Sequence, residues 1–79
     1  MPFLLDDRLV GRADLKAHRE LGVLEVKGVF VEPEEDADRV ALAMAQTLRE
    51  MARWLGLGAV SVGRRGNLAR ALKATLSQA

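Results

Sequence analysis

Residues 8–32 read RLVGRADLKAHRELGVLEVKGVFVE, two runs in which polar residues alternate with apolar or small ones. Successive side chains of a β-strand point to opposite faces of a sheet, so each run predicts a strand with one buried face. Residues 19–22 separate the two runs and end in Gly22, which can adopt the positive φ that tight connections need. The segment therefore predicts a β-hairpin.

The alternation assigns each hairpin residue to a face of the sheet. In the first strand, the expected inward face consists of Leu9, Gly11, Ala13, Leu15 and Ala17, opposite Val10, Arg12, Asp14, Lys16 and His18. In the second strand, one face is expected to carry Leu24, Val26, Gly28 and Phe30, and the other Val23, Glu25, Lys27, Val29 and Val31. The small residues at positions 11, 13 and 28 suggest that a covering helix packs close to this sheet.

A long helix is expected after the hairpin. Pro33 suits its first position, and the acidic residues that follow complement the positive end of the helix dipole. Gly56 is a natural end point. Apolar residues recur at helical spacing and predict a buried stripe of Val40, Ala41, Met44, Leu48, Met51 and Leu55, with Trp54 at the rim of the core or of an interface.

Shorter elements complete the prediction. Residues 3–5 form an apolar run, and Asp6 and Asp7 suit a tight turn into the hairpin. Residues 59–62 predict a strand, residues 63–66 a basic loop, and Asn67 the N-cap of a last helix. That helix would turn Leu68, Leu72 and Leu76 inward. The predicted fold class is α+β in the order β-β-β-α-β-α, a small antiparallel sheet packed against one long and one short helix.

Composition limits the protein to one small domain. A chain of 79 residues buries only about 60% of the surface that its unfolded form exposes, and without cysteine it has no disulfide to supplement its core. The longest apolar runs are too short to span a membrane, and the acidic residues 6–7 do not suit a signal peptide, so a cytoplasmic location is expected. The net charge of +1 does not by itself indicate nucleic-acid binding.

The chain offers little for catalysis. His18 is the one histidine, and without a neighbouring nucleophile or second ligand it is better explained as a surface residue. The carboxylates at the start of the long helix are better explained by its dipole than by acid–base chemistry. Met44 and Met51 belong to the core stripe. We expect no catalytic residue, no cofactor and no metal site.

Two basic features are candidates for contact with phosphate. One is the polar side of the hairpin near its tip, and the other is the loop at residues 63–66, where arginines precede the predicted start of a helix. The alternative is a solvated surface in which Asp14 and Glu25 neutralise the hairpin. The predicted nucleic-acid-binding residues are Arg12, Lys16, His18, Arg19, Arg64 and Arg65.

The sequence also resembles a known family over nearly its whole length. Residues 1–19, MPFLLDDRLVGRADLKAHR, are similar to the C-terminal region of the YcaQ/AlkZ-type winged-helix DNA glycosylases, and so are VEP at 31–33, WLGL at 54–57 and GRRGNL at 63–68. The resemblance implies an enzyme that excises alkylated or crosslinked bases and is built from winged-helix units. It also implies a catalytic Gln-x-Gln or His-x-Gln motif upstream of this region. The chain has neither triplet, since Gln46 and Gln78 stand alone and Arg19 and Glu20 follow His18.

The resemblance suggests a non-catalytic C-terminal module that contacts duplex DNA through phosphates, with the hairpin approaching the DNA. A structural or oligomerisation module is the alternative, and a small-molecule-binding domain is a third possibility. Because a module separated from its scaffold would expose strand edges and apolar surface, self-association as a two-fold dimer is expected.

Overall fold

The computed structural model describes residues 1–78, which form a four-stranded sheet and two helices. The elements are β1 (Pro2–Leu5), β2 (Arg8–His18), β3 (Val23–Val31), α1 (Ala37–Trp54), β4 (Ala59–Arg65) and α2 (Ala69–Ser77). This order confirms the predicted α+β fold and its β-β-β-α-β-α sequence of elements. The strands lie in the order β1-β2-β3-β4, and β4 runs parallel to β3. The sheet is therefore mixed rather than wholly antiparallel, because α1 carries the chain back along the sheet before β4 begins.

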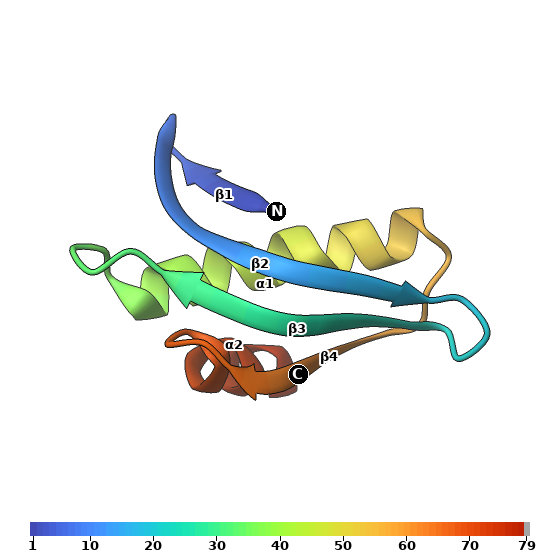
Figure 1. Cartoon of the computed structure of the whole chain (residues 1–79). Coiled ribbons are helices and arrows are strands. Elements are labelled where there is room, and N and C mark those ends of the chain that lie inside the picture. The colour runs from blue at the N-terminus through green and yellow to red at the C-terminus, as the bar shows by residue number, and fades with distance from the viewer. Residues whose placement is uncertain (79) are drawn as a thin grey trace.

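Both helices lie on one side of the sheet, which gives the molecule two layers (Figure 1). The core lies between these layers and is entirely apolar, with no buried charged or polar side chain in residues 1–78. Its largest fully buried side chains come from β2, β3, both helices and the residue before α2; they are Leu24, Met44, Leu48, Leu68, Leu72, Val10, Val26, Val29 and Val40. Within residues 1–78, the opposite face of the sheet has no covering layer, and it is called the open face below.

Two irregularities in the strand pairing overturn part of the predicted face assignment. The β2–β3 register passes over Lys27, so Val29, rather than Phe30, shares the buried face with Val26. Such a bulge inserts one residue and reverses the alternation beyond it. The β1–β2 register likewise passes over Val10, which is fully buried, whereas Leu9 is turned outward and is 47% exposed.

The close packing inferred from the small residues has a different cause from the one expected. A Cβ at position 11 would lie 2.4 Å from the carbonyl oxygen of Phe30, so the neighbouring strand, not a helix, requires glycine there. Gly28 lies on the open face, where the side chains of Phe30 and Arg65 occupy the space above it. Only Ala13 faces the buried core as expected.

The α1 helix begins later than predicted and ends as predicted. Asp36, not Pro33, is its N-cap, and the Asp36 side chain accepts hydrogen bonds from the backbone of Asp38 and Arg39. At the other end Gly56 has a φ of +73°, and the Leu57 N–H donates to the Ala52 carbonyl at 2.8 Å. Together with the Gly56 N–H donated to Arg53, this is a Schellman ending.

The expected helical stripe is correct in its first part only. Val40, Ala41, Met44 and Leu48 are buried, Met51 is half-buried, and Leu55 is 37% exposed. Trp54 does not lie at the core rim, because 90% of its side chain is exposed. The stripe stops here because the chain leaves the helix at Leu55 and buries Leu57 instead.

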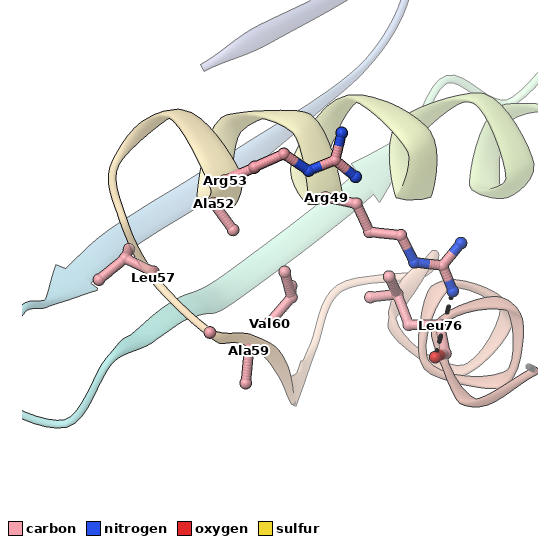
Figure 2. A pocket seen from close by; sticks show the side chains of 8 residues that line it. Arg49, Ala52, Arg53, Leu57, Ala59, Val60 and Leu76 are labelled. Atoms are coloured by element: carbon pink, nitrogen blue, oxygen red, sulfur yellow. Dashed lines mark hydrogen bonds between the residues drawn. The ribbon is translucent and has the colours of Figure 1, made fainter.

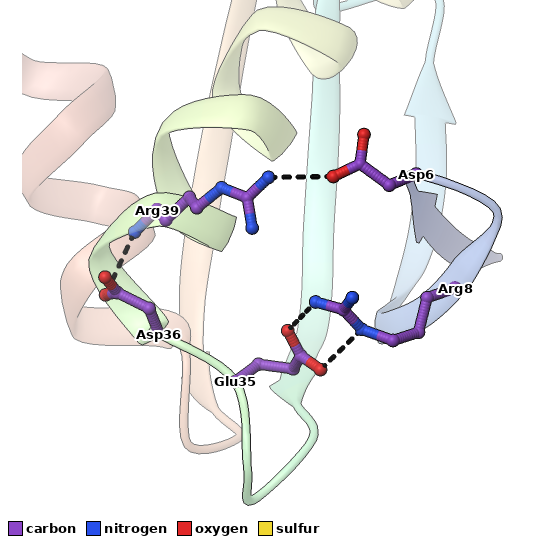
Figure 3. Close-up of polar contacts among 5 residues, drawn as sticks. All are labelled: Asp6, Arg8, Glu35, Asp36 and Arg39. Atoms are coloured by element: carbon purple, nitrogen blue, oxygen red, sulfur yellow. Dashed lines mark hydrogen bonds and ion pairs between the residues drawn. The ribbon is translucent and has the colours of Figure 1, made fainter.

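Two ion pairs connect the β1–β2 turn with the start of α1 (Figure 3). Asp6 and Asp7 both have positive φ, as in the tight turns that join hairpin strands. Arg39 donates to Asp6 at 3.0 Å, and Arg8 forms a two-point contact with Glu35 at 2.7 and 2.9 Å. The contact with Arg8 lowers the pKa of Glu35.

The hairpin turn is attached to the start of β4. The Gly22 carbonyl oxygen accepts hydrogen bonds from the N–H groups of Gly58 and Ala59, at 2.8 and 3.2 Å. Gly22 has the expected positive φ, +67°. The far end of the hairpin is thus held by the segment between α1 and β4.

The junction between β4 and α2 differs from the prediction. Leu68, not Asn67, is the N-cap residue of α2, and it makes no side-chain capping bond. The Asn67 amide instead accepts from the Val31 N–H at 2.8 Å and donates to the Val31 carbonyl at 3.1 Å. Asn67 therefore pairs with β3 as a strand backbone would, instead of capping the helix.

Candidate nucleic-acid interface

The charges of the chain are unevenly distributed along the sequence. No Asp or Glu follows Glu50, whereas five basic residues do; they are Arg53, Arg64, Arg65, Arg70 and Lys73. Four of these lie in β4 and α2. The overall charge of +1 therefore conceals a basic C-terminal part joined to a more acidic remainder.

Arg64 and Arg65, predicted to act together in a loop, are the last residues of β4 and point to different sides of the sheet. Arg65 is paired in register with Gly28, and its side chain covers Gly28 on the open face. Arg64 instead lines a hollow between β4 and α2. The strand alternation that separates them could not be foreseen from residues interpreted as a loop.

The first hollow, called the β4–α2 hollow, has a volume of about 460 Å³. Its charged lining consists of Arg64, Arg70 and Lys73, and no acidic side chain takes part. Arg70 and Lys73 are three residues apart in α2, a spacing that places both on one side of the helix. Sequence reasoning missed these two residues, although the absence of acidic residues after Glu50 could have identified them.

The second hollow, called the open-face hollow, has a volume of about 300 Å³ and is lined in part by Arg12, Phe30 and Arg65. The Arg12 guanidinium carbon lies 5.1 Å from the centre of the Phe30 ring, within the range of a cation–π contact. Asp14 is the acidic residue in its lining. Two of the predicted residues, Arg12 and Arg65, are thus brought together here.

The remaining predicted residues lie toward the hairpin tip. His18 Nε2 is 2.7 Å from Glu25 Oε1, and Lys16 is the register partner of Glu25. The hydrogen bond from His18 lowers the pKa of Glu25, and the charges of Lys27 and Lys16 act in the same direction. Arg19 is exposed in the turn beyond them. This part of the predicted site is therefore partly neutralised by Glu25.

A third hollow, of about 330 Å³, lies between α1, β4 and the end of α2 (Figure 2). Arg49 crosses it and donates to the Thr75 and Leu76 carbonyls, at 3.4 and 3.3 Å. Both carbonyl groups belong to the last turn of α2, where the Thr75 carbonyl also accepts from the Gln78 N–H at 3.3 Å. Arg49 thus has a structural role, whereas Arg53 lines the same hollow without an ion pair in the described part of the chain.

Two further features, a metal site and a membrane-spanning helix, are not found in residues 1–78. Among residues 1–78, no three His, Cys, Asp or Glu side chains are grouped so that they could hold a metal ion. Neither helix in this part of the chain is long and apolar enough to cross a membrane.

Comparison with protein families identifies the chain. The model of the family described as "DNA glycosylase AlkZ-like" matches residues 1–54, which extend from β1 to the end of α1. The chain belongs to the AlkZ-like DNA glycosylase family. This confirms the resemblance found in the sequence. Neither the comparison with curated proteins nor the comparison with solved structures gave a significant match.

The AlkZ-like match divides the candidate site. The matched residues include the hairpin part of the site, which consists of Arg12, Lys16, His18, Arg19 and Phe30. The charged residues of the β4–α2 hollow follow the match. Family membership therefore relates the chain to DNA repair, whereas an argument for the β4–α2 hollow depends on its own geometry.

Proposed function

We propose that the chain is a non-catalytic, cytoplasmic, single-domain C-terminal module of an AlkZ-like, winged-helix DNA glycosylase architecture, and that it contacts duplex DNA through phosphates. The β4–α2 hollow carries this proposal, because three basic side chains line it and no acidic one does. Lys and Arg side chains that neutralise phosphates supply the part of DNA affinity that does not depend on sequence. The predicted hairpin residues Arg12, Lys16, His18 and Arg19, with Arg65, form a second basic surface that supports the proposal.

The sharpest test removes positive charge from the β4–α2 hollow and leaves the fold intact. We expect the double substitution Arg64→Ala and Arg70→Ala to weaken duplex binding, as measured by fluorescence anisotropy at several salt concentrations. Each phosphate contact contributes about 0.9 to the slope of log K against log salt, so losing two contacts should reduce that slope by about two.

A control with the same loss of charge is available on α1. Arg39 and Arg53 line neither the β4–α2 hollow nor the open-face hollow. The ion pair between Arg39 and Asp6 is exposed, so its loss should cost little stability. The variant Arg39→Ala with Arg53→Ala should retain the parent slope. Equal losses in the two double variants would show an attraction to net charge alone, and a parent chain that binds no duplex at low salt would reject the proposal.

A structural or oligomerisation module remains the second candidate, because one end of the molecule carries two exposed large apolar side chains. Trp54 is 90% exposed and Leu21 is 75% exposed. The end of α1 and the hairpin turn lie at the same end of the molecule (Figure 1). A two-fold dimer that covers this end should dissociate when Trp54 is replaced by Ser, which sedimentation velocity would detect. A parent chain that is monomeric at every concentration would exclude this candidate.

A further inference from the structure

The open face carries an arrangement that phosphate contact does not explain. Arg12 on β2 and Phe30 on β3 are register partners, and the Arg12 guanidinium lies over the Phe30 ring on the uncovered side of the sheet. An aromatic ring on a sheet surface is normally covered by a second layer, since its burial is a large source of stability. Here no second layer exists within residues 1–78, and Phe30 is half-buried by its neighbours alone.

The bulge at Lys27 is what places Phe30 on this face. Without it, Phe30 would share the buried face with Val26, as the alternation predicts. Gly28 lies beside the ring and has no side chain, which leaves room for Phe30 and for Arg65 from β4. Residues from three strands thus produce one hollow with an aromatic ring between two arginines.

We infer that the open-face hollow binds an unpaired base of single-stranded DNA, which stacks on the Arg12 guanidinium and the Phe30 ring beneath it. A guanidinium group is planar and stacks on π-systems, and Arg12 is exposed although its guanidinium lies over Phe30. Arg65 supplies a positive charge for the adjoining phosphate. The volume of about 300 Å³ accommodates a flat heterocycle.

Asp14 gives the site a chemical preference as well as a limit. Its carboxylate lines the hollow and can accept hydrogen bonds from the amino groups of cytosine, adenine or guanine. The same negative charge opposes a phosphate placed directly on it. The hollow is therefore suited to a base whose phosphate is displaced away from Asp14 and toward Arg65.

The experiment compares three DNA ligands of equal length by anisotropy: a single strand, the same strand in a duplex, and a strand with the same phosphates but with abasic sites. Base–aromatic stacking accounts for about a ten-fold change in affinity per base. The parent chain should bind the abasic strand about ten-fold more weakly than the normal strand. The variants Phe30→Leu and Arg12→Lys should both lose this preference. Phe30→Leu removes the aromatic ring, and Arg12→Lys keeps the positive charge but removes the planar guanidinium group.

The control is Arg53→Lys, which makes the same exchange of charge type outside the hollow and should keep the preference of the parent. Equal binding of normal and abasic strands by the parent would overturn the inference, and so would a preference that survives in both hollow variants. Folding of each variant is checked by its thermal transition. Duplex binding reports on the proposed function separately, so a chain that binds the normal single strand and no duplex would reject that proposal and keep this inference.

Discussion

Single residues determine how α2 joins the sheet, and Gly66 is the most constrained of them. Its φ is +104°, and a Cβ there would lie 1.9 Å from the carbonyl oxygen of Val29. Both its conformation and the available space therefore require glycine. Gly56 has a similar conformation, with a φ of +73°, but nothing lies within 4 Å of its missing Cβ. Replacing Gly56 thus tests the backbone conformation alone, whereas replacing Gly66 tests the conformation together with the steric clash.

We expect Gly66→Ala to destabilise the domain much more than Gly56→Ala. The left-handed conformation alone costs an alanine about 1–2 kcal/mol, which is the expected loss at position 56. At position 66 the β3 backbone must also move, so the loss should exceed about 3 kcal/mol. Urea denaturation followed by circular dichroism measures both values. Equal losses in the free energy of unfolding would show that the β3 backbone can move away from position 66 without destabilising the domain.

At the scale of elements, periodic segments were predicted well and their boundaries less well. Alternation identified β2 and β3, and helical spacing identified α1, because burial imposes those periods on the sequence. The bulges at Val10 and Lys27 were missed, since neither residue type marks a bulge and only pairing with the neighbouring strand reveals one. Arg64 and Arg65 were misjudged for a related reason, because their opposite directions depend on β4 extending to Arg65.

The start of α1 gives a direct test at this scale. Asp36→Ala should cost about 1 kcal/mol, because it removes the acceptor for the N–H groups of Asp38 and Arg39. Pro33→Ala should cost less, since Pro33 lies before the helix rather than in its first turn. Thermal unfolding of the two variants gives the comparison. A larger loss at Pro33 would restore the boundary that the sequence predicted.

For the whole molecule, ion pairs join parts that the sequence leaves far apart. Arg8 and Glu35 connect the first hairpin to the segment before α1, and the contact lowers the pKa of Glu35. A carboxylate whose pKa is lower in the folded state stabilises the fold at pH values above its unfolded pKa, about 4.3. That stabilisation is lost as the pH falls through the lower, folded-state pKa.

Glu35→Gln should therefore flatten the acid side of the stability profile. The parent should lose stability between neutral pH and pH values below about 4, and the variant should lose less over the same range because it has no carboxylate to protonate there. Urea midpoints at a series of pH values measure this. Glu34→Gln is a suitable control, since Glu34 forms no ion pair in the described residues. Identical profiles for parent and Glu35→Gln would show that the pair does not contribute to folding.

The attachment of the hairpin turn to the start of β4 has a consequence for recognition. Because the Gly22 carbonyl already holds two backbone N–H groups, the far end of the hairpin is fixed before any ligand arrives. A flexible loop loses conformational entropy when it closes on a partner, and that loss reduces affinity. A ligand that reaches this tip therefore meets an ordered surface, and its association should be governed by fit and charge rather than by the cost of ordering the loop.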